Sequence, residues 1–151
     1  MIISQHNEAY INPNWVLLDS ESTDHIFCNE KLLTDIEPKI DGECLRLYSF
    51  GGKLDTQQKG KFGGFKVWYK PKSLSNTLSL GLVTEQYRVT LDSEDENIFL
   101  VHISEGHVIK FIHGPSPCLY YFDAGNIHMF KLKLAFSFLN TVFENKKLFK
   151  N

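Results

Sequence analysis

The chain has 151 residues, 42% of them hydrophobic, which is enough apolar mass for one hydrophobic core but too little for two. Sixteen basic and eighteen acidic residues give a formal net charge of −2, so composition provides no long-range field that would attract nucleic acid. Three cysteines without metal-ligand spacing fit a reducing compartment better than a disulfide scaffold. A signal-peptide pattern and a bilayer-length apolar tract are both missing from the sequence, which therefore predicts no membrane partner.

The first strand signal ends in an acid. Residues 1–13 are polar and predict a leader with little structure of its own, whereas residues 15–18 are four apolar residues bounded by turn formers, the pattern of a buried strand. Asp19 follows directly, and then Ser20, Glu21, Ser22 and Thr23. Aspartic peptidases place a carboxylate in this way, because two such carboxylates that share a proton can activate a water. The alternative is an Asp-Ser turn with a hydroxyl capping the next element.

Two glycine-rich hairpins are predicted next. One joins residues 44–48 to residues 54–56, and the other lies within residues 61–69. A flap that closes over a substrate needs glycines at which the backbone can bend. Each hairpin has such a pair, so the flap candidates are Gly51 and Gly52 in the first hairpin and Gly63 and Gly64 in the second, and the sequence does not choose between them.

The remaining segments complete an all-β prediction. Leu80–Gln86 suits one or two helical turns, and alternating or apolar runs at 87–91, 98–103 and 107–112 predict strands. Short strands with Gly-rich turns indicate a small β-barrel or sandwich with at most one short helix, which we place at residues 14–123. The residues that we expect in its core are Trp15, Val16, Leu18, Leu78, Leu80, Val89 and Leu91.

Residues 124–151 differ in character from the predicted barrel. Residues 134–149 can form one amphipathic helix with lysines near its end, where cations suit the helix dipole. The alternative, which we favour, is an exposed linker that packs only transiently.

The chain resembles a known family from about residue 14 to residue 149. Residues 17–22 are similar to the active-site loop of retropepsins, hydrophobic-hydrophobic-Asp-(Ser/Thr)-Gly-(Ser/Ala), except that Glu21 stands where glycine is expected. The longer resemblance is to the protease-like β-barrel region of Gag-Pol polyproteins from copia-type (TNT-like) retrotransposons. Its motifs occur here in the family's order: WVLLDSEST (15–23), IFCN (26–29), VWYKP (67–71), SNTLSL (75–80), YRVTLDS (87–93), CLYYFD (118–123), FLNTV (138–142) and ENKKLF (144–149).

The resemblance implies a retropepsin-like barrel that cleaves its own Gag-Pol polyprotein as a homodimer, in the cytoplasm or within virus-like particles, without a cofactor or a metal. Asp19 would meet its symmetry mate, while Ser20 and Ser22 brace the loops, and residues 124–151 would be a linker toward a pre-integrase region. Glu21 adds a Cβ atom and a carboxylate beside acids that already repel. A catalytically inactive structural or interaction barrel of a retroelement polyprotein is therefore the alternative.

Two further constellations are weaker. Asp92 sits in a Leu-Asp-Ser-Glu repeat of the Asp19 motif, but too few residues separate the two acids for a full second lobe, and an acidic turn is the simpler interpretation. His102, His107, His113 and Cys118 carry zinc-ligand chemistry, but their spacing matches no compact zinc finger, so we predict no metal site.

Overall fold

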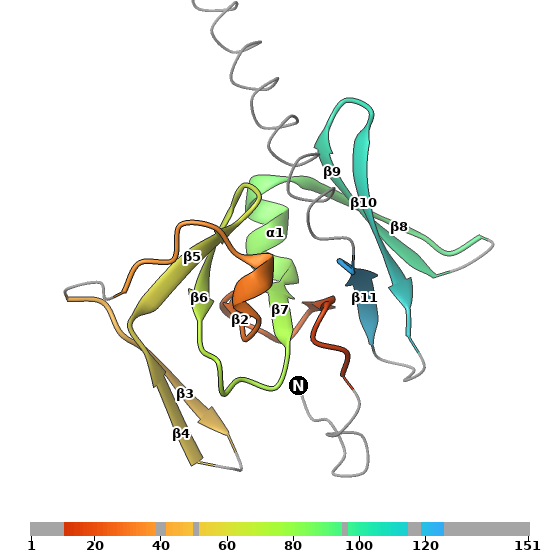
Figure 1. The fold of residues 1–151 in the computed structure, drawn as a ribbon. Helices are drawn as coiled ribbons and strands as arrows, with labels where there is room; N and C mark the ends of the chain where they lie inside the picture. Colours follow the sequence, from red (N-terminus) through yellow and green to blue (C-terminus); the bar gives the residue numbers. More distant parts are fainter. Residues whose placement is uncertain (1–10, 39–41, 50–51, 95–96, 115–118, 126–151) are drawn as a thin grey trace, which may run out of the picture.

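The computed structural model describes residues 11–38, 42–49, 52–94, 97–114 and 119–125 (Figure 1). The described residues are mostly β, with one α-helix, α1 (Leu80–Gln86), and one 3-10 helix (Glu30–Leu32). The all-β prediction and the short helix are confirmed. Residues 1–10 of the predicted leader (1–13) and residues 126–151 of the predicted C-terminal segment (124–151) lie outside the described residues. The strands are β1 (Trp15–Asp19), β2 (Ile26–Phe27), β3 (Leu45–Ser49), β4 (Gly52–Thr56), β5 (Gln58–Phe62), β6 (Phe65–Tyr69), β7 (Asn76–Ser79), β8 (Arg88–Asp92), β9 (Ile98–Ser104), β10 (His107–His113) and β11 (Tyr120–Asp123).

Nine strands form one sheet in the order β5-β6-β2-β7-β1-β11-β10-β9-β8, and β3 and β4 form a separate hairpin. Figure 1 shows the two ends of the sheet on opposite sides of α1, so the sheet bends around a shared interior. The fold is barrel-like in this sense, but the sheet is open, because β5 and β8 end it and do not pair with each other.

The centre of the sheet brings together segments that are far apart in the sequence. β1 pairs in parallel with β7, and Asp19 lies opposite Ser79 at the end of both strands. β2, which follows the Asp19 loop, lies between β6 and β7. The loop between β1 and β2 is therefore held next to the start of α1, which follows β7 directly.

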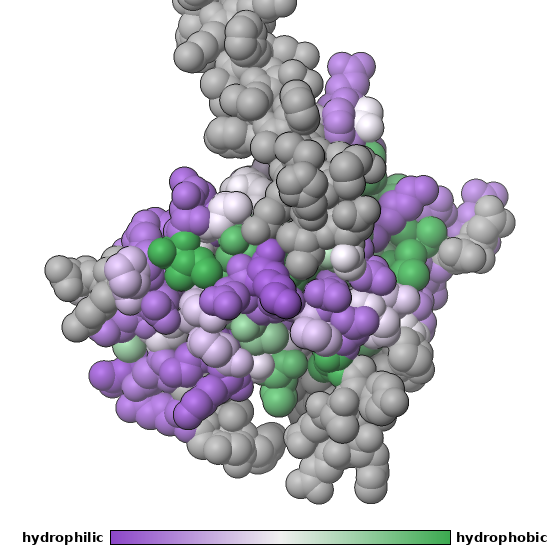
Figure 2. Space-filling model, viewed as in Figure 1, coloured by the Kyte–Doolittle hydropathy of each residue, from purple (hydrophilic) through white to green (hydrophobic). Residues whose placement is uncertain are grey.

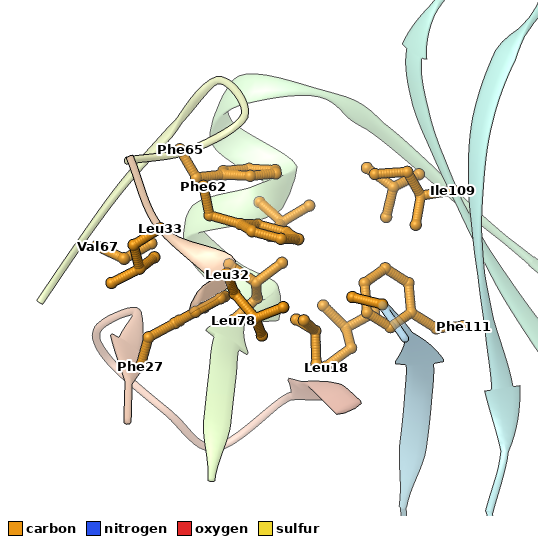
Figure 3. Close-up of a cluster of buried hydrophobic side chains, with 14 residues drawn as sticks. Leu18, Phe27, Leu32, Leu33, Phe62, Phe65, Val67, Leu78, Ile109 and Phe111 are labelled. Carbon is orange, nitrogen blue, oxygen red and sulfur yellow. The ribbon is translucent and has the colours of Figure 1, made fainter. Parts of the chain in front are cut away.

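The core fills the space between the two halves of the sheet. Figure 3 shows Ile109 and Phe111 of β10 on one side of it, and Phe62, Phe65 and Val67 of β5 and β6 on the other. Leu18 and Leu78, from the paired central strands β1 and β7, lie between the two groups. Aromatic rings contact each other inside this core; the ring centroids of Phe27 and Phe62, for example, are 4.9 Å apart. These contacts remove large apolar surfaces from water, which is the main stabilising term of the fold.

The expected core residues divide into three groups. Val16, Leu18 and Leu78 are buried, as predicted. Partial burial against the core is found for Leu80 and Val89, while Trp15 is partly exposed and stacks on Tyr121 with ring centroids 3.9 Å apart. The prediction for Leu91 is wrong, because 54% of this residue is exposed. The physical reason is its place on β8, the last strand of the sheet, beyond which the described residues place no further strand.

The helices of the described residues are α1 and one 3-10 helix. None of the helices in this part of the chain has the length and the apolar character that crossing a bilayer requires.

Candidate active-site loop

Asp19 lies at the end of β1 with its carboxylate held by its own loop. Oδ1 accepts a hydrogen bond from the backbone N–H of Glu21 at 2.9 Å, and Oδ2 accepts one from the Ser22 hydroxyl at 2.8 Å. The residue is only partly buried, so further lone pairs of the carboxylate stay open to the surface. Two donors on different oxygens fix the plane of the carboxylate, which is the first requirement of a preorganised acid.

Ser79 connects this loop to β7 and α1. Its hydroxyl donates to the carbonyl of Ser22 at 2.7 Å, and its backbone N–H donates to Nδ1 of His25 at 2.9 Å. The same hydroxyl oxygen accepts from the backbone N–H of Leu82 at 3.3 Å, so Ser79 is also the N-cap of α1. The loop, the strand and the helix therefore form one connected unit.

His25 is the buried titratable group of this unit. It is 6% exposed, and its ring packs edge-to-face on Phe65 with centroids 5.4 Å apart. Burial lowers the pKa of His25 to about 4, although the nearby Asp24 carboxylate acts in the opposite direction. Nδ1 accepts a hydrogen bond, so the neutral ring carries its proton on Nε2.

Asn76 is a further buried polar side chain, at the opposite end of the paired strands β1 and β7 from Asp19 and Ser79. It is fully buried, and its Oδ1 accepts from the backbone N–H groups of Cys28 at 3.1 Å and Asn29 at 2.9 Å. Its Nδ2 donates to the carbonyls of Pro13 at 2.8 Å and Trp15 at 3.0 Å. One amide thus joins the start of β1 to the end of β2. Sequence reasoning missed both His25 and Asn76, although each is a polar residue beside apolar strand residues.

The other residues of the predicted active-site loop differ in their contacts and exposure. Ser22 braces Asp19, whereas Ser20 is exposed and the hydroxyl of Thr23 donates to Asp24 at 2.9 Å. Glu21 contributes only its backbone N–H to Asp19, and its side chain is exposed. Its backbone is not left-handed, so a residue with a Cβ atom is accommodated here without strain. Within one chain, the departure from glycine does not disturb the loop.

The two glycine hairpins differ in how they are held. The tip of the β5–β6 hairpin is fixed to the end of α1, because Nε2 of Gln86 donates to the carbonyl of Gly64 at 2.8 Å, and a Cβ atom on Gly64 would collide with the hydroxyl of Tyr87. Gly63 forms the turn with a φ of 56°. The β3–β4 hairpin pairs only within itself and projects from the body of the molecule (Figure 1). Gly52 lies opposite Ser49 in this hairpin, and Gly51 lies outside the described residues.

Replacing Gly64 tests whether the β5–β6 tip is fixed. We expect Gly64→Ala to lower the free energy of unfolding by roughly 1 to 3 kcal/mol, since the new methyl group must displace the Tyr87 ring. Gly81→Ala is the matched control, because position 81 lies in α1 and a Cβ atom there would make only an ordinary contact of 3.8 Å with the hydroxyl oxygen of Ser79. This change should be neutral or stabilising by about 0.5 to 1 kcal/mol. Chemical denaturation of both variants measures the difference. Equal stabilities would mean that the tip moves freely.

The described residues of the two weaker candidate sites, the Asp92 repeat and the histidine-cysteine set, form no contact with Asp19 that the structure shows. Asp92 accepts from the backbone N–H of Glu94 at 3.1 Å in a turn like that of Asp19, but it ends β8, the fourth strand away from β1 in the sheet. Nε2 of His102 lies 2.9 Å from the Thr90 hydroxyl. No group of three potential metal ligands gathers among the described residues. Cys118 lies outside the described residues.

Comparisons of the chain with protein-family models, with curated proteins and with solved structures find no match. The geometry of the loop is therefore what supports a function. A partly exposed carboxylate, oriented by a backbone amide and a hydroxyl and anchored through Ser79, can act as a general base or, when protonated, as a general acid.

Proposed function

We propose that this chain is the protease-like barrel of a retroelement Gag-Pol polyprotein, and that it cleaves peptide bonds as a homodimeric aspartic endopeptidase. The observation that carries the proposal is the pair of hydrogen bonds from Glu21 N–H and the Ser22 hydroxyl to the two oxygens of Asp19. The described part of one chain supplies one such acid, and the chemistry needs two, so in this proposal the site is complete only when two copies bring their loops together.

In the proposed reaction the two Asp19 carboxylates share one proton. The ionised one removes a proton from water while the protonated one donates its proton to the carbonyl oxygen of the scissile bond, and the hydroxide adds to the carbonyl carbon. Collapse of the tetrahedral intermediate, with a proton passed to the departing nitrogen, releases the two fragments. Segments of the Gag-Pol polyprotein are the substrate, and the projecting β3–β4 hairpin is the flap, because the β5–β6 tip is bound to α1.

A second candidate is a catalytically inactive interaction barrel, and the position of Glu21 favours it. The Glu21 side chain is exposed two residues from Asp19. A twofold contact between the loops would bring four carboxylates near one axis, and their mutual repulsion opposes the contact at neutral pH. Under this alternative the loop keeps its local geometry without ever forming a pair.

Peptide cleavage by the full chain distinguishes the aspartic endopeptidase from the inactive interaction barrel. We expect pepstatin-sensitive cleavage between about pH 5 and 7, above the unperturbed carboxylate range, with a loss of about 100-fold or more in Asp19→Asn. Glu21→Gly should raise the rate at neutral pH because it removes the repulsion.

Asp123→Asn and Glu94→Gly are the matched controls. Asp123 accepts from the backbone N–H of Gly125 at 2.8 Å, as Asp19 does from Glu21. Glu94 lies two residues after Asp92 and donates its backbone N–H to that carboxylate, as Glu21 does to Asp19. Each control therefore makes the same substitution in a similar turn away from the Asp19 loop. Cleavage that survives Asp19→Asn would exclude the peptidase. Inertness of every variant, Glu21→Gly included, would leave the interaction barrel.

A further inference from the structure

The two edge strands of the nine-stranded sheet, β5 and β8, differ in whether other backbone groups bond to their outer sides. The outer edge of β5 is occupied: Thr34 and Lys61 exchange backbone hydrogen bonds of 2.9 and 2.8 Å, and the N–H of Glu37 donates to the carbonyl of Lys59 at 2.8 Å. β8, at the other end, pairs with β9 along all five of its residues. No backbone hydrogen bond reaches its outer side from the part of the chain that the structure describes. An edge of this kind is a template for another strand.

The sequence of β8 is complementary to itself in one orientation. It reads Arg88, Val89, Thr90, Leu91 and Asp92. If two copies pair antiparallel about Thr90, each Arg88 lies opposite the partner's Asp92, and each Val89 lies opposite the partner's Leu91. Opposite charges and apolar pairs that face each other directly are the contacts that stabilise antiparallel strands. Parallel pairing in register would place like charges together, so the charges select the antiparallel orientation.

The side chains that this pairing would use are available. Arg88 and Asp92 are exposed, and neither forms an ion pair with another described residue. Leu91 is 54% exposed, although it shares its strand face with core residues. Figure 2 shows apolar surface on the right of the molecule, over the end of the sheet that β8 and its neighbours form. β8 also lacks proline and lysine, the residues that usually protect an edge.

We propose that β8 is a homodimerisation edge, at which two copies of this chain join their sheets antiparallel about Thr90. The occupant is a second copy because the charge pattern of β8 fits itself. This surface is separate from the Asp19 loop, since β8 lies four strands from β1 in the sheet. The proposal therefore holds whether or not the chain is a peptidase. A five-residue strand pair gives a small interface, so we expect a dimer that dissociates in the micromolar range or above.

Charge reversal tests the pairing by sedimentation velocity over a micromolar concentration series. Arg88→Asp and Asp92→Arg, each alone, place like charges opposite each other and should raise the dissociation constant by about tenfold or more. The double variant Arg88→Asp/Asp92→Arg should regain the dimer. An equimolar mixture of the two single variants should form heterodimers, because the chain with two acids then meets the chain with two arginines. Lys110→Asp, on the same sheet face two strands inward, is the control and should change nothing.

A cross-link tests the register. In a Cys44→Ser/Cys118→Ser background, which removes the exposed thiol of the described residues and the cysteine that lies outside them, Thr90→Cys should give a covalent dimer on oxidation. Residues directly opposite in an antiparallel pair have Cα atoms about 4.5 to 5.5 Å apart, within the span of a disulfide. Ser93→Cys should give none, because position 93 lies far from its own copy in this register.

Three results would overturn the proposal. One is a monomer at every concentration, which would leave the edge to a strand from a different protein or to solvent. Another is a dimer that persists in both single reversals while Thr90→Cys fails to cross-link. The third is a dimer that responds only to Glu21→Gly, which would assign self-association to the Asp19 loops of the proposed peptidase instead. Circular dichroism of each variant confirms that the compared chains are folded.

Discussion

Acidification is expected to destabilise this protein through His25 by up to roughly 3 kcal/mol. The pKa of the buried ring is lowered to about 4 from its ordinary value of 6.5, chiefly by burial. Between these two pH values the unfolded chain binds a proton that the folded chain does not, so stability is fully present above about pH 6.5 and is lost as the pH falls toward 4. A difference of this size in pKa corresponds to about 3 kcal/mol.

The measurement is the free energy of unfolding by denaturant at a series of pH values. His25→Gln should be less stable than the parent near pH 7, because the ring acceptor for Ser79 N–H is lost, and its stability should fall less steeply toward pH 4. His107→Gln, at an exposed histidine, should keep the slope of the parent. Equal slopes for the parent and His25→Gln would show that this ring titrates normally.

This titration also bears on the proposed peptidase. Protonation of His25 at Nδ1 removes the acceptor for Ser79 N–H, and Ser79 holds the Asp19 loop through the carbonyl of Ser22. We therefore expect any cleavage activity to fail on the acid side together with the loop, even though protonation relieves the repulsion between carboxylates.

Asn76→Ala is expected to destabilise the fold by about 4 kcal/mol. The change removes the four hydrogen bonds that a fully buried amide makes to the backbone and leaves two N–H groups and two carbonyls without this partner. Asn76→Asp keeps the oxygen that faces Cys28 and Asn29 but turns the donor into an acceptor opposite the carbonyls of Pro13 and Trp15, so it should also be strongly destabilising.

Asn12→Ala is the control for this prediction. The Asn12 side chain accepts from the backbone N–H of Asn14 at 2.9 Å at an exposed turn, and water can replace that contact. Its loss should lower the free energy of unfolding by no more than about 1 kcal/mol. Thermal and chemical denaturation of the three variants give the comparison, and similar losses in Asn12→Ala and Asn76→Ala would contradict the assigned role.

Much of the local structure could be predicted from the sequence, because its signals are local. The glycine turns located both hairpins, and the apolar residues at 80–86 located α1. The pairing of distant strands carries no such signal. Nothing in residues 15–19 shows that β1 pairs in parallel with β7 or that β11 lies on its other side.

The errors and omissions have the same origin. Leu91 was expected in the core because alternation reports a strand but not whether that strand ends a sheet. His25 and Asn76 were missed because their importance depends on donors and acceptors from segments more than forty residues away. The contact between Asp19 and Ser22 could be anticipated from the sequence because it is local, three residues apart in one loop.

The occupied edge of β5 limits how many copies of this chain can join through their sheets. A sheet that is open at both edges can add copies without limit and form a fibril. Here residues 34–37 close one edge of the nine-stranded sheet, so strand addition has a single starting point. Once a partner covers β8, the pair presents two β5 edges that are already closed. Strand pairing through this sheet would then terminate at two chains.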